Sequence, residues 1–419
     1  MSCFPISCAS QHKLISKYPN VVQPHDLRSD RSSSCVPFPA RKASPFVACD
    51  PAFWRLFQAA GPKLRVLAQD QTEHGNSFHE AGVWSEQTQS LFFTSNRRVD
   101  ERGEAYTTLS RMDLSKRARA GSRLLQWQDL DQDEYPFPTP NGGTILPNGN
   151  ILLCDQGRGD DQLSSLVVVD PTGKRRPRPV LNNHQLLPFN SLNDVVVVPP
   201  VCSASNGSHE SGYQCSGNKE VEDDAASLGL SEGYVILFTD PSYGYEQRFK
   251  PAPRLPNQIY GFDPNTGEVK ALAEGFDKPN GIVVDEKRKR CYITDTGYIR
   301  GDGSTCGTRP GTIHVFDIEP RSDEGIPFEL VNKRLFASVD CGAPDGIKLD
   351  TEGNVYAGCF DGVHVWSSTG TLLGKILLSD ETGGQAGCAN LCFIPAGLVC
   401  MAESRLFLVE GLDVHGALL

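Results

Sequence analysis

The sequence lacks the signatures of several common classes of protein. Its 419 residues contain no window of 18 or more apolar residues, which argues against a membrane-spanning helix. No Cys-x-x-Cys pair is present, so a zinc ribbon or a thioredoxin-type motif is unsupported. A Gly-x-Ser-x-Gly motif, a phosphate-binding loop and a dinucleotide fingerprint are also absent. Any catalytic chemistry must therefore come from other residues.

Basic charge is scarce as well. Lys and Arg number 40 against 51 Asp and Glu, which gives a formal net charge of -11. Nucleic-acid binding needs a basic surface that displaces counterions from phosphates, so we expect neither a nucleic-acid nor a membrane partner. The N-terminus, Met1–Ile6, has no early basic residue and no apolar core, so a secretory signal is not evident. We expect a cytoplasmic monomer, with secretion left open.

The 14 cysteines favour buried thiols in strands over a disulfide framework. Cys388 and Cys392, for example, lie in an apolar run that is typical of a strand. Cys202 and Cys215 flank a polar insertion that also carries the glycosylation sequon at Asn206, and they would be able to pair in an exported protein. The cysteines therefore leave the compartment open.

The chain divides into a leader and one long domain. Residues 1–45 are rich in Ser, Pro, Arg and Lys without a period, which predicts a loosely ordered leader. Residues 46–419 then form the domain, with a short helix expected at 51–60. From about residue 63, short apolar runs alternate with Gly, Pro, Asn and Asp clusters, a pattern typical of β-strands. Residues 201–232 form a polar insertion in this pattern, predicted to be a solvated loop.

An internal repeat predicts the fold. A polar opening residue, an apolar strand, a turn and a second apolar strand recur in six copies: Glu80–Ser95, Pro140–Asp155, Leu192–Asp240, Pro279–Asp295, Pro344–Gly358 and Ala389–Ala402. Six such units predict an all-β, six-bladed β-propeller whose first strands line a central channel. Lys63–Ala68 would close the ring beside Arg405–Val409, and Gln258–Phe262 is an expected outer strand. Two unrelated β-domains are the alternative.

The opening residues of the six copies are all carboxylates or carboxamides: Glu80, Asn141, Asn193, Asn280, Asp345 and Asn390. In a propeller these side chains would point at one another around the channel mouth. Their hard oxygens suit Ca²⁺ or Mg²⁺, and two carboxylates would balance the charge of a divalent ion. The alternative is ordinary turn chemistry, because Asn-Gly and Asp-Gly are common turn formers.

Several motifs together resemble the SMP-30/gluconolactonase/regucalcin family. They are Phe78–Trp84, Asn190–Val198, Leu237–Gly244, Pro279–Val284 and Pro344–Ile347. The His-Glu-Ala-Gly run at residues 79–82 and Phe92–Arg97 are most similar to fungal lactonohydrolase-type members. The resemblance covers roughly residues 50–419. It implies a six-bladed propeller with one divalent metal near the channel mouth that hydrolyses sugar lactones or related cyclic esters.

The resemblance also implies particular ligands. Matched motif by motif, the metal ligands fall on Glu80, Asn193, Asn280 and Asp345. The ion would be Ca²⁺, with Mg²⁺ or Zn²⁺ as alternatives. Asn141 and Asn390 lie outside this set and are candidate substrate contacts, as is Tyr243. One departure from the family is Leu192, which stands where members of the family often have a proline, and it affects rigidity more than ligand identity.

The mechanism implied is attack of a metal-polarised water on the lactone carbonyl. Asp345 is the candidate base, although a purely ligating role is an equal alternative. Asp240 and Asp295, which end second strands, are expected to anchor blades, and strand alternation predicts that His79 points away from Glu80.

The substrate remains open at this point. Its recognition would depend on the irregular segments at the channel mouth: 98–106, 156–164, 201–232 and 299–311. Hydrolysis of organophosphate-type esters, or binding of calcium or a metabolite without turnover, are the competing hypotheses.

Overall fold

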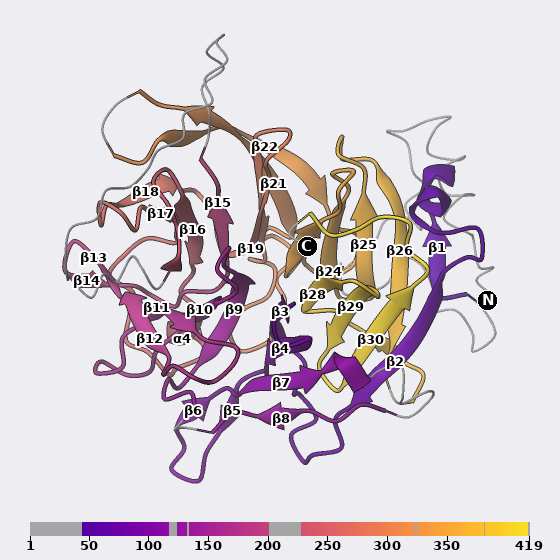
Figure 1. Cartoon of the computed structure of the whole chain (residues 1–419), viewed down its shortest axis with the longest axis horizontal. Helices are drawn as coiled ribbons and strands as arrows, with labels where there is room; N and C mark the ends of the chain where they lie inside the picture. The colour runs from indigo at the N-terminus through magenta and orange to yellow at the C-terminus, as the bar shows by residue number, and fades with distance from the viewer. Residues whose placement is uncertain are drawn as a thin grey trace.

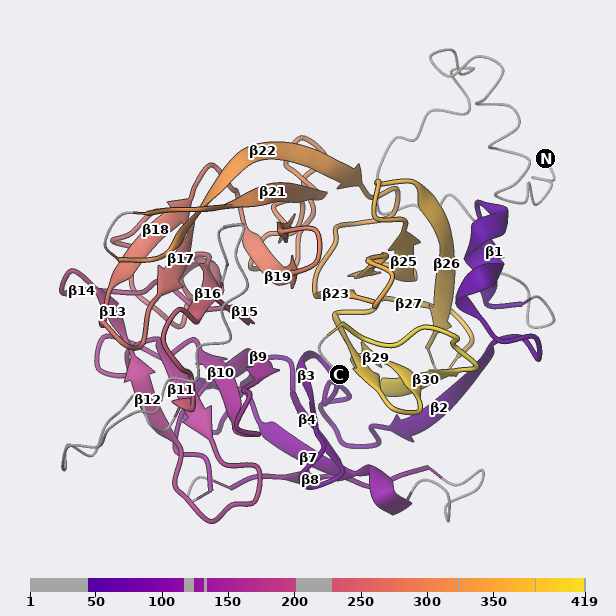
Figure 2. The ribbon, with the colours of Figure 1, turned by 45° about the horizontal axis from the view of Figure 1, so that its top comes forward.

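The computed structural model describes residues 44–116, 124–131, 134–200, 228–322, 325–380 and 382–417. Six antiparallel sheets surround a central axis (Figure 1), and the tilted view in Figure 2 shows the same radial order. The six-bladed β-propeller predicted from the repeat is therefore confirmed, and two unrelated β-domains are not found. No helix in the described part of the chain is long and apolar enough to cross a membrane.

Each blade follows the chain from the channel outwards. Blade 1 contains β3 (Glu80–Ser85), β4 (Ser90–Thr94), β7 (Leu109–Asp113) and β8 (Gln128–Asp129). Blade 2 contains β9 (Pro140–Ile145), β10 (Ile151–Asp155), β11 (Ser165–Val169) and β12 (Arg178–Leu181). Blade 3 contains β15 (Val195–Val198), β16 (Val235–Asp240), β17 (Gln258–Phe262) and β18 (Val269–Ala273).

The second half of the ring repeats this order. Blade 4 contains β19 (Pro279–Asp285), β20 (Arg290–Asp295), β21 (Thr312–Pro320) and β22 (Phe328–Ser338). Blade 5 contains β23 (Ile347–Leu349), β24 (Val355–Cys359), β25 (Gly362–Trp366) and β26 (Leu372–Ser379), with β27 (Gln385–Ala386) beside β26. Blade 6 contains β28 (Asn390–Ile394), β29 (Gly397–Ala402), β30 (Arg405–Glu410) and β2 (Lys63–Gln69).

The ends of the chain close the ring. β2 pairs antiparallel with β30, and Lys63 lies opposite Glu410, so the closure predicted for Lys63–Ala68 is confirmed. A second closure was not predicted: β1 (Phe46–Ala48) adds an outer strand to blade 5 by pairing with β26. Because the N-terminal segment belongs to two blades, it ties the first and last parts of the chain together.

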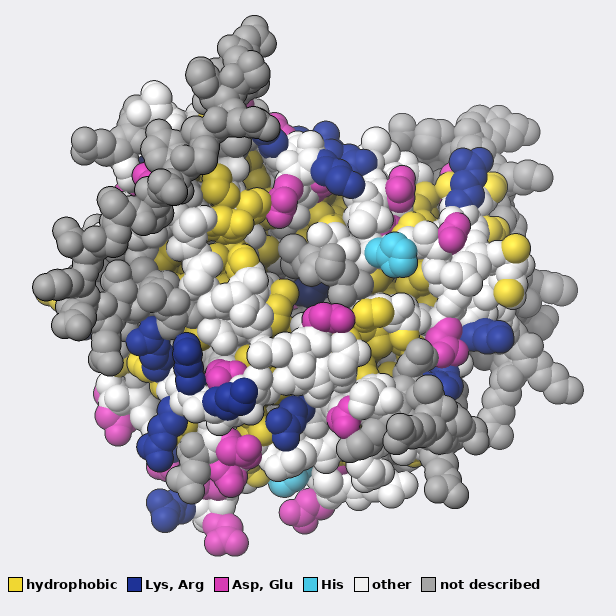
Figure 3. All heavy atoms as spheres, in the orientation of Figure 1, with side chains coloured by type: hydrophobic (Ala, Val, Ile, Leu, Met, Phe, Trp, Pro, Cys, Tyr) yellow, Lys and Arg dark blue, Asp and Glu magenta, His cyan; other side chains and the backbone are white. Residues whose placement is uncertain are grey.

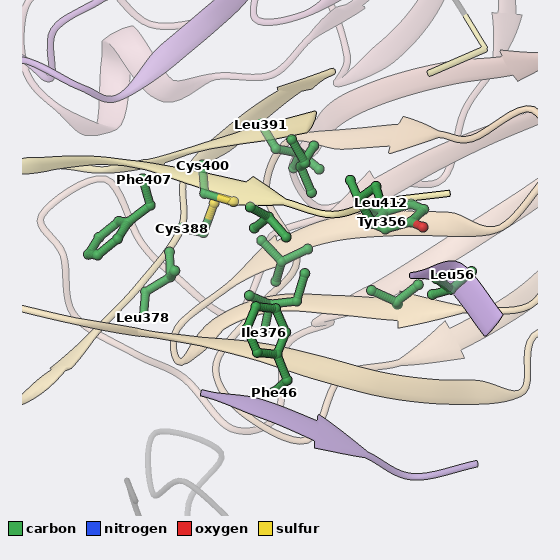
Figure 4. Packing of buried hydrophobic residues seen from close by; sticks show 14 of the residues in the cluster. Phe46, Leu56, Tyr356, Ile376, Leu378, Cys388, Leu391, Cys400, Phe407 and Leu412 are labelled. Carbon is green, nitrogen blue, oxygen red and sulfur yellow. The ribbon is translucent and has the colours of Figure 1, made fainter. Parts of the chain in front are cut away.

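The core is distributed between the blades rather than gathered in one place. Six clusters of buried apolar side chains each fill the space between neighbouring blades. Figure 4 shows the cluster between blades 5 and 6, where Phe46 and Leu56 of the N-terminal segment pack beside Ile376 and Tyr356. The alternating apolar strands of the sequence thus bury both faces of every sheet.

Smaller elements differ in detail from the predictions. The helix expected at 51–60 is a short 3₁₀-helix, η2 (Pro51–Leu56), which begins with the Asp50 side chain accepting from the Ala52 amide at 2.8 Å. The polar insertion lies between β15 and β16 as predicted. Residues 1–43 of the leader and residues 201–227 of the insertion, with Cys202, Asn206 and Cys215, lie outside the described residues.

Candidate metal centre

The six opening residues define what we call the polar ring: Glu80, Asn141, Asn193, Asn280, Asp345 and Asn390. Five of them are buried and Asp345 is half-buried. Asn141 and Asn280 lie within β9 and β19, not in turns, so the turn interpretation is wrong for these two dipeptides. The ring residues open the inner strands of successive blades, which places them at one end of the channel.

The glycines that follow the ring residues serve close packing of the inner strands. A Cβ on Gly142 would lie 2.4 Å from the carbonyl oxygen of Asn193, and one on Gly281 would lie 2.6 Å from that of Asp345. Neighbouring inner strands thus approach closely at the level of the ring, which only glycine permits. The repeated Asn-Gly and Asp-Gly pairs reflect a narrow channel.

Hydrogen bonds join five of the predicted site residues in two separate groups. Asn280 Nδ2 donates to Asp345 Oδ1 at 2.6 Å and lies 3.3 Å from the hydroxyl of Tyr243. Across the ring, Asn390 Nδ2 donates to Glu80 Oε2 at 2.5 Å. Tyr243 opens the short helix α4 (Tyr243–Glu246), which carries its ring to the channel. The structure therefore brings Glu80, Asn280, Asp345, Asn390 and Tyr243 together.

The two carboxylates influence each other electrostatically. Burial raises the pKa of Glu80 to about 8, and the nearby Asp345 carboxylate adds to the rise. Burial also raises the pKa of Asp345 to about 6, against the opposing effects of His79 and the hydrogen bond from Asn280. Ionisation of both carboxyl groups in this place is unfavourable unless a cation compensates their negative charges.

The carboxamides have oxygens without partners. Among the described residues, Oδ1 of Asn141, Asn193 and Asn280 is buried and accepts no hydrogen bond. No side-chain contact joins Asn141 or Asn193 to the other ring residues in the described structure, so their place in the ring rests on register and burial. Buried acceptors without donors are rare and call for an explanation. Two carboxylates and unpartnered amide oxygens form an all-oxygen donor set that fits a hard divalent cation.

Threonines and aspartates at the ends of second strands hold the ring in place. Thr94, Thr239 and Thr294 donate their hydroxyls to the carbonyls of Asn141, Asn280 and Asp345, each in the next blade, at 3.2, 2.9 and 2.8 Å. Asp240 accepts from the amides of Asn190 and Ser191, and Asp295 accepts from those of Asp277 and Lys278. The anchoring role predicted for Asp240 and Asp295 is confirmed. The threonine contacts were missed, although Thr-Asp recurs in the sequence.

Replacing Thr294 by Val should loosen the ring without removing a ligand. The change leaves the buried Asp345 carbonyl short of a donor, so we expect a loss of about 1–2 kcal/mol in the free energy of unfolding. If the polar ring holds a divalent ion, its affinity for calcium should also fall several-fold, because Asp345 is held less firmly. Urea unfolding and calorimetric calcium titration measure both effects, and Thr294→Ser should restore them. Unchanged affinity for calcium in Thr294→Val would show that Thr294 does not position Asp345.

His79 lies beside the ring and is bound on its outer side. Its Nδ1 is 2.7 Å from Oε1 of Glu403, which also accepts from Asn96 Nδ2 at 3.0 Å. Burial alone would lower the pKa of His79, but the Glu403 carboxylate, with smaller contributions from Glu80 and Asp345, raises it to about 10. Strand alternation does not settle the direction of this side chain, because β3 begins only at Glu80.

Two of the predicted rim loops border one cleft of about 780 Å³. The hairpin of β5 (Arg98–Val99) and β6 (Ala105–Tyr106) forms one wall, and Arg158 and Gln162 form another. Thr107, which also lines the cleft, donates to the carbonyl of Pro140 beside the ring residue Asn141 at 2.6 Å. The cleft therefore lies at the same end of the channel as the polar ring.

A second acidic cluster lies in blade 5, where Asp340, Asp361 and His364 have a spacing that would suit a metal. However, the Lys375 ammonium is 2.6 Å from Asp340 Oδ1 and 3.0 Å from Asp361 Oδ2, and His364 Nε2 is 2.6 Å from Asp361 Oδ1. A divalent ion would have to displace this buried ammonium. We interpret the group as a structural ion network rather than a metal site.

Comparison with known proteins agrees with this architecture. The family described as SMP-30/Gluconolactonase/LRE-like region matches residues 231–398. A gluconolactonase of Zymomonas mobilis is 22% identical over 273 residues, which are 64% of this chain and 61% of the relative. Lactonohydrolase oryL of Aspergillus oryzae is 32% identical over 162 residues, 36% of each chain. The matches thus span less than two thirds of the length of these curated relatives.

Solved structures share the fold over a longer stretch. A Xanthomonas campestris gluconolactonase superposes with a TM-score of 0.57 at 20% identity and covers 88% of this chain and 95% of its own. A calcium-binding regucalcin of Agrobacterium tumefaciens reaches 0.52 at 13% identity, covering 84% and 95%. Residues 231–398 therefore match the SMP-30/Gluconolactonase/LRE-like family model, and the whole described chain shares its fold with these structures, which agrees with the resemblance seen in its motifs.

Proposed function

We propose that this chain is a metal-dependent hydrolase that opens a lactone ring, and that Glu80, Asn193, Asn280 and Asp345 hold its divalent ion. The main support is the polar ring itself, where buried Glu80 and half-buried Asp345, both with raised pKa values, lie among carboxamide oxygens that have no other partner. All four ligands offer oxygen, which suits Ca²⁺ and Mg²⁺ better than Zn²⁺, because Zn²⁺ prefers nitrogen and sulfur. A set of four protein ligands favours Ca²⁺ over Mg²⁺, because Mg²⁺ usually keeps several of its waters.

The substrate class follows from the relatives. Proteins similar to this chain are named gluconolactonase and lactonohydrolase. Both names describe hydrolysis of a cyclic ester. We therefore infer that this chain takes a sugar lactone or a related cyclic ester, bound over the polar ring with its substituents toward the cleft beside β5 and β6.

The side chains of the polar ring would have different roles in ester hydrolysis. A divalent ion bound here supplies a Lewis acid toward the lactone carbonyl and lowers the pKa of a bound water. Asp345 would accept a proton as the water oxygen adds to the carbonyl carbon, because it is a carboxylate of the polar ring beside the place where the water would lie. The C–O bond of the lactone then breaks, and the oxygen that this releases takes a proton. Asp345 acting only as a ligand is the alternative.

Neighbouring residues orient the proposed metal ligands. The amide nitrogen of Asn390 is bound to Glu80, so Asn390 fixes Glu80 and is a weaker candidate for touching substrate. Tyr243 holds the amide of Asn280 in the same way. Asn141 keeps an unpartnered Oδ1 and is the better candidate to accept a hydrogen bond from a substrate hydroxyl.

A panel of sugar lactones, aliphatic lactones and organophosphate esters, assayed with and without chelator, tests this function. We expect hydrolysis of at least one lactone that chelator abolishes and calcium restores. Metal-dependent turnover of the organophosphates alone would change the substrate class. A protein whose melting temperature responds to calcium but which hydrolyses nothing in the panel would instead be a binding protein.

The raised pKa values predict how calcium and pH act together on stability. Glu80 and Asp345 hold protons more tightly in the folded protein than in the unfolded chain, so the metal-free protein loses stability as pH rises from about 4 through about 8. Calcium removes this loss by compensating the two negative charges. The gain in melting temperature on adding calcium should therefore be small at pH 5 and large at pH 8, and Glu80→Gln should flatten the difference.

A further inference from the structure

The channel contains a second cavity at the end opposite the polar ring. Its volume is about 410 Å³, within the range of pockets that hold small organic ligands. The lining comes from the later parts of the inner strands and from Gly416 and Ala417 near the end of the chain, and it includes no ring residue. Figure 3 shows a hollow at the centre of this face with a basic side chain inside it.

The cavity wall is mainly apolar, and its polar or charged side chains are Ser85, Glu86, Gln87, Thr144 and Lys348. Val83, Ile145, Leu146 and Phe393 are among the side chains that line it. Lys348 is its single basic residue, and Glu86 its single acidic one, with the Glu86 carboxylate already accepting from Trp84 Nε1 at 3.1 Å. Within the described structure, the Lys348 ammonium makes no hydrogen bond and no ion pair. A half-buried ammonium in apolar surroundings without a partner is unfavourable.

One buried carboxylate, that of Asp194, interacts electrostatically with Lys348, but this carboxylate is hydrogen-bonded to other groups. Asp194 is fully buried and accepts from the amides of Val195 at 2.9 Å and Ile282 at 3.3 Å. The charge of Lys348 affects Asp194 from a distance, and the two groups form no ion pair. Among the described residues, therefore, no hydrogen-bond or ion-pair partner of the Lys348 ammonium would have to be displaced by a ligand in the cavity.

We propose that this cavity binds a small organic monocarboxylate with an apolar body. The carboxylate would pair with Lys348 in the channel, and the body would lie against Val83, Ile145 and Phe393 toward the opening. A cation of the same shape would be repelled by the ammonium, and a neutral apolar molecule would leave it without a partner. This site is separate from the polar ring and does not rest on lactone hydrolysis.

Calorimetric titration of the full chain with octanoate tests the proposal. The titration is run in chelator, so that no metal in the polar ring can hold the carboxylate. Octanoate should bind with one molecule per chain, whereas octylammonium, the matched cation, should show no binding. Absence of octanoate binding, or equal binding of both probes, would overturn the proposal.

Two variants locate the site. Lys348→Met keeps the length of the side chain and removes its charge, and should weaken octanoate binding by about tenfold or more, as expected for loss of a charged hydrogen bond. Ala417→Trp, at an exposed position on the lining, should weaken it by filling the opening. Lys174→Met, at an exposed turn, is the control and should bind as the wild type does. Wild-type affinity in either of the first two variants would contradict the assignment.

Discussion

Replacing Asp345 by Asn should lower kcat/KM for the best lactone substrate by about a thousandfold or more, the scale of loss when a group central to transition-state stabilisation is removed. Asn keeps the shape of the side chain but removes one of the two charges of the polar ring. The same change should stabilise the metal-free protein, because the buried carboxylate of Glu80 then no longer faces a second one. A substitution that lowers activity but raises stability is typical of a functional site.

The variant also separates the two roles considered for Asp345. If the side chain only ligates the metal, a high calcium concentration should restore much of kcat. If it also accepts the proton of the attacking water, kcat should stay low with metal bound, and the acidic limb of the pH–rate profile should disappear. Asp170→Asn, in the turn after β11, is the control and should be fully active. Activity of Asp345→Asn within threefold of wild type would remove Asp345 from the mechanism.

Replacing Lys375 by Met should cost about 3–5 kcal/mol in the free energy of unfolding, the range found when one partner of a buried ion pair is removed. Lys375 and Asp361 are each 1% exposed, and the ammonium bonds both Asp361 and Asp340. His364 and Lys375 together hold the pKa of Asp361 well below its usual range despite burial. Without the lysine, an ionised carboxylate stays in the interior of blade 5 with less compensation.

Chemical denaturation at neutral pH measures this loss, and a second variant shows whether its cause is charge. Adding Asp361→Asn to Lys375→Met should recover part of the stability, because the uncompensated carboxylate is then gone. A loss below 1 kcal/mol in the single variant, or no recovery in the double variant, would mean that the network contributes little. Uptake of a divalent metal by the wild-type cluster would contradict our interpretation of it.

The features that were predictable from the sequence are those that depend on patterns repeated along the chain. Short apolar runs separated by turn residues, in six repeats, predict blades. Lys63–Ala68 lacks a partner nearby, which indicates pairing with the end of the chain. The opening residues share a position in each repeat, so symmetry alone brings them to one level of the channel. Burial and unpartnered oxygens then agree with a site there, while the ligand roles stay a proposal.

The features that were not predictable depend on contacts between blades. Thr294 reaches the carbonyl of Asp345 in the next blade, and Gly281 is needed because that same carbonyl lies close by. Lys375 meets Asp340 and Asp361 only because adjacent strands and loops of blade 5 converge. The pairing of β1 with β26 joins residues more than 300 positions apart. The recurring Thr-Asp and Asn-Gly pairs are visible in the sequence, but the contacts that they make with the next blade are not.

The most direct test of the account is to measure calcium occupancy and lactone hydrolysis on the same samples. Protein stripped with chelator is titrated with calcium, and bound ion and initial rate are recorded at each step for the wild type and for Glu80→Gln. The account predicts one high-affinity ion per chain, a rate that rises in proportion to occupancy, and loss of both in the variant. Full hydrolysis in the stripped wild type, or undiminished calcium binding in Glu80→Gln, would contradict it.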